Sequence, residues 1–178
     1  MSDLSTSKPD FSVQIEPWAE SDLNLLVRLN IPEMLEHLGG TETEDQVHNR
    51  HKRYRELKAK GKGCMFSIVL LPESVAVGNV GYWETEWQGE TIYEMGWGVL
   101  PSYQGQGIAA IATASAISLA KDANKHRFMH AFPAVDNPAS NAICRKLEME
   151  WVAECSFEYP PGTFMRCNDW RFKLNDKE

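Results

Sequence analysis

The chain has 178 residues, 43% of them hydrophobic and 24% charged, which is the size and composition of one globular domain. No apolar run reaches the roughly 18 residues that a membrane span needs, and the polar N-terminus lacks the apolar segment of a secretory signal. The net charge of −7 disfavours nucleic acid as a partner, because phosphates attract basic surfaces. We expect a disordered tail over residues 1–10 and a single domain over residues 11–175.

The four cysteines, Cys64, Cys144, Cys155 and Cys167, are scattered along the chain. They form no C-x-x-C pair, and no histidine cluster has the spacing of zinc ligands, so we expect no metal. Scattered cysteines are typical of a reducing compartment, which predicts a cytoplasmic protein.

The N-terminal part predicts a strand and a helix. Apolar residues alternate with polar ones over residues 11–18, which indicates a half-buried strand. A helix follows, capped by Ser21 or Asp22 and interrupted by Pro32. The residues expected on its buried face are Leu23, Leu26 and Val27.

A second helix is expected within residues 41–61. Thr43 and Gln46 fit a capping box at its start. Its inward residues are expected to be Val47, Tyr54 and Leu57. We expect His48 and His51 on an exposed face of this helix, since no third ligand accompanies them.

The rest of the chain predicts strands over residues 64–71, 74–84 and 91–100, joined by short turns and therefore antiparallel. A buried helix of small residues over 108–123, a strand over 127–135 and a helix over 137–149 follow, the last with Asn137 as N-cap and Pro138 at its first position. A hairpin over 150–174 ends the domain. The order β-α-α-β-β-β-α-β-α-β-β predicts an α/β domain with a mixed, largely antiparallel sheet.

The stretch "PSYQGQGIAA", residues 101–110, admits three interpretations. "GQGIAA" fits the dinucleotide pattern G-x-G-x-x-A, but no strand runs straight into its first glycine and no acidic residue ends the next strand. The two glycines also suit a plain turn before a buried helix. In the third interpretation they let an anion approach the backbone N–H groups at a helix N-terminus.

Two motifs resemble those of the GNAT superfamily of N-acetyltransferases. "VLPSYQGQGIA" resembles its acetyl-CoA signature Q/R-x-x-G-x-G/A, with Gln104, Gly107 and Ala109 in place. "NPASNAICRKLEM" resembles its later helix, N-x-x-A/S-x-x-x-Y-x-x-L-G-F, where Asn137 and Leu147 match, as does Ser140. The resemblance covers roughly residues 11–174, and the wording "GWGVLPSYQGQG" is similar to the branch that includes ribosomal-protein alanine acetyltransferases.

The resemblance implies the GNAT fold, with about seven strands and helices on both sheet faces. It implies direct transfer of the acetyl group of acetyl-CoA to a primary amine, on a protein N-terminus, a polyamine or another small molecule. Exposed strand edges in such folds often pair, so a homodimer is one expected assembly. A module that binds CoA without turnover is the alternative function, and a dinucleotide-dependent enzyme is a weaker third.

The resemblance also implies positions for the cofactor. The main chain of Trp97, Gly98 and Val99 would bond the pantetheine arm, and Asn137 marks the helix face beside it. The loop that would hold the pyrophosphate consists of Gln104, Gly105, Gln106, Gly107, Ile108, Ala109 and Ala110.

The chain departs from the family pattern at three positions. Cys144 stands where many relatives have the tyrosine that protonates the leaving thiolate, and Glu148 and Met149 replace Gly-Phe. Either the Cys144 thiol or a water is then the acid, unless Cys144 serves only for packing.

Transfer also needs a base, because an ammonium must lose its proton before it attacks. Glu94 is the first choice, Glu84 and Glu86 are the second, and His130 is the third. The aromatic residues expected to stack on a cationic acceptor are Tyr82, Trp83, Trp87 and Tyr159.

Overall fold

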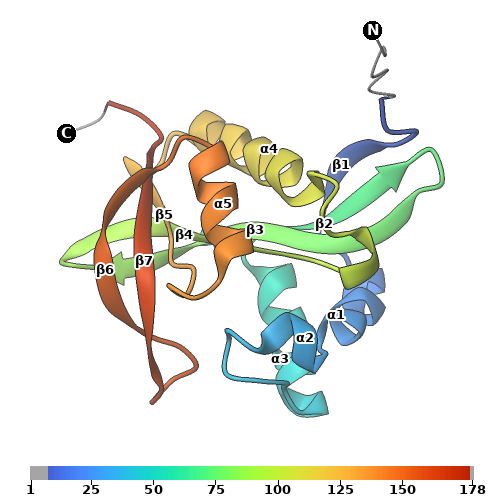
Figure 1. Ribbon diagram of the computed structural model, residues 1–178, viewed down its shortest axis with the longest axis horizontal. Helices are drawn as coiled ribbons and strands as arrows, with labels where there is room; N and C mark the ends of the chain where they lie inside the picture. The colour runs from blue at the N-terminus through green and yellow to red at the C-terminus, as the bar shows by residue number, and fades with distance from the viewer. Residues whose placement is uncertain (1–7, 177–178) are drawn as a thin grey trace, which may run out of the picture.

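The computed structural model describes residues 8–176 as a seven-stranded sheet flanked by helices (Figure 1). The strands lie in the order β1-β2-β3-β4-β5-β7-β6. Their bounds are β1 Ser12–Pro17, β2 Gly63–Leu71, β3 Val75–Trp87, β4 Glu90–Val99, β5 Phe128–Ala131, β6 Glu150–Glu158 and β7 Phe164–Lys173. The first seven residues of the expected N-terminal tail lie outside the described residues.

The helices cover both faces of the sheet. Those on one face are α1 Leu23–Leu29, α2 Pro32–Leu35 and α3 Glu44–Glu56, and those on the other are α4 Ile108–Ala123 and α5 Pro138–Lys146 (Figure 1). Two short 3-10 turns, η1 Glu20–Asp22 and η2 Pro101–Tyr103, precede α1 and α4. The predicted α/β fold with a mixed, mostly antiparallel sheet is confirmed.

Each face of the sheet has its own core. The larger lies under α4 and α5 and includes Ile68, Val80, Met95 and Ile108. The smaller lies under α1 and α3 and includes Leu25, Leu29 and Val47. Because side chains alternate along a strand, the even-numbered residues of β3 from Val80 onward face α4, as do odd-numbered residues of β4, and their neighbours face α1–α3. The β2–β3 pairing is irregular before Gly78, and there Val77 faces α4.

The sheet is nearly interrupted between β4 and β5. These two strands run parallel and share only the register pairs Tyr93↔Met129 and Glu94↔His130. β3 and β4 stay paired from Trp87↔Glu90 to Gly78↔Val99. The last five residues of β4, 95–99, therefore lack a strand neighbour on the β5 side.

Several local expectations are confirmed. The Thr43 side chain accepts a hydrogen bond from Gln46 N in a complete capping box. Asn137 caps α5 through a hydrogen bond from Ser140 N, with Pro138 at the first position. α4 spans the expected residues 108–123.

Three local expectations need correction. Val27 is 53% exposed, because α1 turns Leu25, Leu26 and Leu29 inward. His51 is 7% exposed, and its Nδ1 accepts a hydrogen bond from Trp18 Nε1 at 3.0 Å. It lies one helical turn after Val47 and shares that buried face.

The short helix α2, begun by Pro32 at N1, had not been expected.

Candidate active site

The gap between β4 and β5 exposes main-chain hydrogen-bonding groups. Leu100 N donates to Val77 O at 2.8 Å, across the β3–β4 pair. Because antiparallel residues alternate between bonded and non-bonded pairs, the N–H and C=O groups of Met95, Trp97 and Val99 point towards β5. An extended ligand in the gap would meet these groups as another strand would.

The loop from β4 to α4 ends in two glycines with left-handed backbone. Gly105 has φ 76°, and Gly107, the N-cap of α4, has φ 78° and no side-chain capping bond. The N–H groups of the first turn of α4, starting with Ile108, have no partner within the helix. With the positive end of the helix dipole they form a site for an anion such as phosphate.

Gln104 ties this loop back to the strand. Its Nε2 donates to Val99 O at 2.8 Å. Gln106 precedes the N-cap, and Ala109 and Ala110 keep the first turn of α4 free of long side chains.

Lys146, at the end of α5, adds a positive charge that the sequence analysis missed. Its Nζ lies 3.8 Å from the point that a Cβ on Gly107 would occupy. Among the described residues no carboxylate pairs with it (compare the ion pairs formed by other lysines). The sequence does place Lys146 in the last turn of the helix that Asn137 begins. Because that helix packs beside α4, this position could have indicated a cation near the glycine loop.

Glu94 lies where β4 leaves β5, on the α1–α3 side. Its Oε2 accepts a hydrogen bond from Trp83 Nε1 at 3.2 Å. Gly96 makes room for that indole, since a Cβ there would lie 3.0 Å from the Trp83 ring. Burial raises the pKa of the Glu94 carboxyl to about 7, against the opposing effect of the Trp83 hydrogen bond.

The second-choice carboxylates have different surroundings. Glu84 points to the other face and forms ion pairs with Lys125, His126 and Lys62. The hydrogen bond from Lys125, with those from His126 and Lys62, lowers the pKa of Glu84 to about 2. Glu86 is exposed and accepts a hydrogen bond from Thr91 Oγ1. A carboxylate held like Glu84 is a poor proton acceptor.

His130 belongs to a buried network on the face of Glu94. Its Nδ1 lies 2.6 Å from Asp169 Oδ1, and Trp87 Nε1 donates to Asp169 Oδ2 at 3.1 Å. His130 and Asp169 are 6% and 2% exposed. Sequence analysis missed Asp169. A carboxylate in the expected last strand, between Cys167 and Arg171, could have indicated a buried acid that pairs with another polar side chain.

The predicted aromatic residues do not all meet. Trp83 and Trp87 lie on the Glu94 face, and the Trp87 ring packs 4.7 Å from that of Phe132. Tyr82 is 3% exposed, on the opposite face, in the core with Tyr93. Tyr159 OH, beyond β6, accepts a hydrogen bond from Arg50 Nη2 at 2.7 Å.

A cavity of about 290 Å³ lies between the end of α2, the segment after β5 and the β6–β7 hairpin. Its lining includes Tyr159 and the acidic residues Glu36 and Asp136. His37 lies between these two carboxylates, 3.2 Å from each. Arg166 also lines the cavity, and its guanidinium pairs with Glu154. The two carboxylates, at the segment that leads from β5 to Asn137, suit a cationic ligand.

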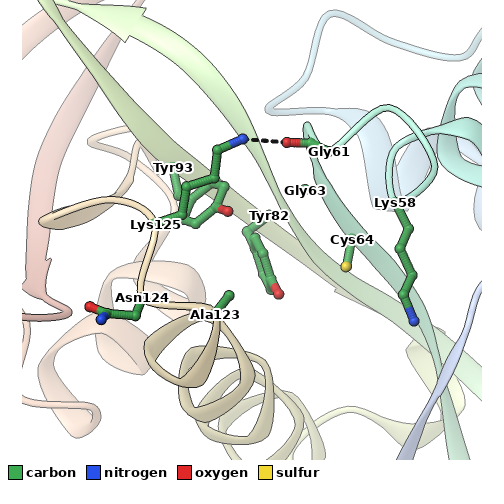
Figure 2. A pocket seen from close by; sticks show the side chains of 9 residues that line it. All are labelled: Lys58, Gly61, Gly63, Cys64, Tyr82, Tyr93, Ala123, Asn124 and Lys125. Atoms are coloured by element: carbon green, nitrogen blue, oxygen red, sulfur yellow. Dashed lines mark hydrogen bonds between the residues drawn. The ribbon is translucent and has the colours of Figure 1, made fainter.

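A larger cavity of about 540 Å³ opens at the other end of α4 (Figure 2). Tyr82, Tyr93 and Cys64 line it, with Lys125 bonded across it to Gly61 O. The C-terminal end of α4 faces this cavity, and the dipole there disfavours phosphate. Neither loop glycine nor Glu94 lines it.

Cys144 is fully buried in the larger core. Burial raises the pKa of its thiol to about 12.

Two further properties concern residues 8–176 only. No group of three or more His, Cys, Asp or Glu side chains there is placed to hold a metal ion. None of the helices in this range is long and apolar enough to cross a membrane.

Solved structures share this fold. An acetyltransferase from Salmonella typhimurium that modifies the N-terminal serine of ribosomal protein L7/L12 is 19% identical, with 92% of this chain and 96% of that chain covered and a TM-score of 0.75. The ribosomal-protein-S5-alanine acetyltransferase from Vibrio fischeri is 18% identical, with coverages of 93% and 94% and a TM-score of 0.73. A putative acetyltransferase from Salmonella typhimurium, solved with acetyl-CoA, is 18% identical, with coverages of 94% and 95% and a TM-score of 0.73.

No curated protein sequence matches the chain significantly. The family model described as an acetyltransferase (GNAT) domain matches residues 12–150. This match spans most of the chain and includes the β4–β5 gap, the glycine loop and both helices of the α4–α5 face. The chain therefore belongs to the GNAT family of acetyltransferases.

Proposed function

We propose that this enzyme transfers the acetyl group of acetyl-CoA to a primary amine by direct attack within a ternary complex. The observation that carries the proposal is the partly buried Glu94 carboxyl beside the β4–β5 gap. It offers a proton acceptor next to residues 95–99 of β4, which pair with β3 and have no register partner on the β5 side.

The cofactor assignment uses three groups of contacts. The main-chain groups of Trp97 and the N–H of Val99 would bond the pantetheine arm, with Gly98 between them. The N-terminal turn of α4 would bind the pyrophosphate, and Lys146 would add a cation. Asn137 would begin the α5 face beside the arm. A N–H at Trp97 would act as the oxyanion donor, a contribution of roughly 3 kcal/mol.

Proton transfer supports Glu94 as the base. An α-ammonium with a pKa of about 7.7–8 gives its proton to a carboxyl of pKa about 7 at a cost of roughly 1 kcal/mol. A lysine-type ammonium of pKa about 10.4 costs roughly 4.6 kcal/mol. Glu94 is therefore better matched to an α-amine, such as that of the N-terminal serine modified by the L7/L12 acetyltransferase of the same fold.

The burial of Cys144 supports a packing role, with water or another group as the acid. On the acceptor side, Trp83 contacts Glu94, Trp87 lies farther along the same face beside Asp169, and Tyr159 would line the entry. The carboxylates of Glu36 and Asp136 would attract the ammonium through that opening.

The proposal is tested by calorimetry followed by a transfer assay. Acetyl-CoA and CoA should bind and NAD should not. Thiol release should then require an amine, and a panel of a peptide with a free N-terminus, spermidine and butylamine should identify the class. Binding of CoA without thiol release with any amine would leave the alternative, a CoA-binding module.

Gly107→Glu tests the loop, because it adds a carboxylate where phosphates would lie. The affinity for acetyl-CoA should fall at least tenfold, about 1.4 kcal/mol. Gly89→Glu is the matched control, since Gly89 also has positive φ (83°) and open space but lies in the β3–β4 turn. Equal affinity in the two variants would contradict the cofactor assignment.

A further inference from the structure

The α1–α3 face of the sheet holds a second group able to accept a proton. Glu94 and His130 are direct register partners on β4 and β5. Side chains of paired residues leave the sheet on the same face, about 5 Å apart at their bases. His130 therefore begins beside Glu94, at the point where the two strands separate.

The network around His130 fixes which ring nitrogen carries the proton. Asp169 Oδ1 lies 2.6 Å from Nδ1, so a carboxylate there makes Nδ1 the protonated nitrogen. Trp87 donates to the other oxygen of Asp169 and holds the carboxylate in place. The neutral ring then carries its lone pair on Nε2.

Nε2 of His130 has no hydrogen-bond partner among the described residues. His130 is 6% exposed, and the only enclosed side-chain nitrogen or oxygen without a partner in residues 8–176 is Arg50 Nε, so we infer that Nε2 lies at the edge of the buried network. The ring plane is set by the stacked ring of Phe132, whose centroid lies 5.8 Å away at an angle of 16°. The nitrogen is thus oriented and has a lone pair that no described residue occupies.

The charged and titratable groups around His130 come from β7 and β4, with Glu150 of β6 paired to one of them. β7 contributes Asp169 and, directly opposite His130, Arg171, whose guanidinium binds Glu150. β4 contributes Glu94, and Cys167 lies two residues before Asp169.

The transfer reaction has two protons to place. An ammonium R–NH₃⁺ that becomes an amide R–NH–CO–CH₃ loses two protons while its nitrogen bonds to the acetyl carbon. The C–S bond breaks with its electron pair on sulfur. One proton ends on that sulfur as the thiol of CoA, and the other leaves to solvent.

We propose that the Asp169-held His130 is a second proton carrier of the active site, acting beside Glu94. This rests on the proposed function. Glu94 takes the proton that the ammonium loses before attack and passes it to solvent. His130 Nε2 takes the proton that the nitrogen loses as the C–N bond forms, and this proton goes to the thiolate. His130 thereby protonates the leaving thiolate, the role that a tyrosine has in many relatives and for which this chain has Cys144 at the corresponding position.

Kinetics across pH separate the two carriers. With butylamine, the loss of kcat in Glu94→Gln should shrink as pH rises, because the amine deprotonates without help. His130→Gln should lower kcat by about 10²-fold or more, and that loss should persist at high pH. KM for acetyl-CoA should stay within about twofold. His126→Gln is the matched control, a histidine bonded to a carboxylate (Glu84, 2.8 Å) on the other face, and should keep kcat.

Nitrogen-15 NMR of the histidines tests the geometry without any activity. Wild-type His130 should show the Nδ1–H tautomer. In Asp169→Asn, the Trp87 N–H should hold the amide oxygen, so that the amide NH₂ faces Nδ1 and moves the proton to Nε2. This variant should lose kcat as His130→Gln does while keeping the wild-type melting temperature within a few degrees.

The outcomes are distinct. An active wild type whose kcat is unchanged in His130→Gln, or whose His130 carries its proton on Nε2, would overturn this inference alone. A wild type that binds acetyl-CoA but acetylates no amine would overturn the proposed function and this inference together.

Discussion

Glu84 and Glu94 lie on neighbouring strands of one hairpin, and the register places Glu84 opposite Tyr93 and Glu94 opposite Trp83. One residue of offset sends them to opposite faces of the sheet. Glu84 meets two lysines and a histidine, and its pKa falls to about 2. Glu94 meets one indole N–H and apolar surroundings, and its pKa rises to about 7.

The difference shows that position along a strand does not decide whether a carboxylate can act as a base. On the α4 face, Glu84 is held by ion pairs and Cys144 is enclosed in the core. On the α1–α3 face, Glu94 and His130 have partners that orient them and still leave an atom free to accept a proton. The chemistry that we propose is therefore confined to one face.

The largest expected effect is on turnover. Glu94→Gln should lower kcat for an amine substrate at pH 7 by about 10²–10⁴-fold, because no carboxylate remains to take the ammonium proton. Glu84→Gln is the matched change on the other face and should keep kcat, measured by thiol release. A similar loss in both variants would remove the distinction between the two faces.

The next effect is on stability above neutral pH. A folded pKa of about 7, above the unfolded value near 4.5, means that the Glu94 carboxyl costs no stability below pH 4.5. Its ionisation weakens the fold progressively up to about pH 7. Glu94→Gln should therefore raise the free energy of unfolding by up to about 3 kcal/mol at pH 8 and change it little at pH 4. Urea denaturation at both pH values measures this gain, and equal gains would contradict the raised pKa.

Glu84 should show the opposite sign. Its folded pKa lies below the unfolded value, so its ion pairs stabilise the protein above about pH 4.5, and this contribution is lost as pH falls towards 2. The lysine partners are partly exposed and screened, so Glu84→Gln should cost only about 1–2 kcal/mol at pH 7. Urea denaturation of Glu84→Gln at pH 7 and pH 3 should give a smaller loss in the free energy of unfolding at pH 3. A cost that is constant with pH would point to lost packing.

The smallest effect on activity is expected at Cys144. Cys144→Ala should keep kcat within about twofold and cost roughly 1–2 kcal/mol of stability through the cavity it leaves. Mass-spectrometric mapping of alkylation should find the partly exposed Cys64 and Cys155 modified first and Cys144 last, with or without CoA. Selective protection of Cys144 by CoA, or a tenfold loss in Cys144→Ala, would restore the thiol as a candidate acid.

Sequence patterns were sufficient for most of the fold. The turns between β2, β3 and β4 are short, and caps such as Thr43 and Asn137 depend on neighbours three residues away, so local rules found them. Val27 and His51 were misplaced because the inward stripe of a helix depends on where the helix begins and on what packs against it.

The parts of the site formed by main-chain groups could be predicted from the sequence. The parts that depend on contacts between side chains far apart in the sequence could not. The glycine loop follows from residues 104–110 alone. The Asp169–His130 pair joins residues 39 apart, and the Lys146–Gly107 approach joins two helices, so neither leaves a local pattern. Tyr82 and Trp83 differ by one position, and only the register of the sheet tells which faces Glu94.

Only two register pairs join β4 to β5, fewer than join any other neighbouring strands of the sheet. On one side lies the β1–β4 meander, and on the other lie β5, β7 and β6. A ligand bonded to β4 in the gap and covered by α5 would link the two halves. The bound ligand then connects the two halves of the sheet. By mass action, a ligand that binds only the folded protein and is present at 100 times its Kd raises the free energy of unfolding by about 2.7 kcal/mol. The melting temperature of this protein should thus report the occupancy of its own active site.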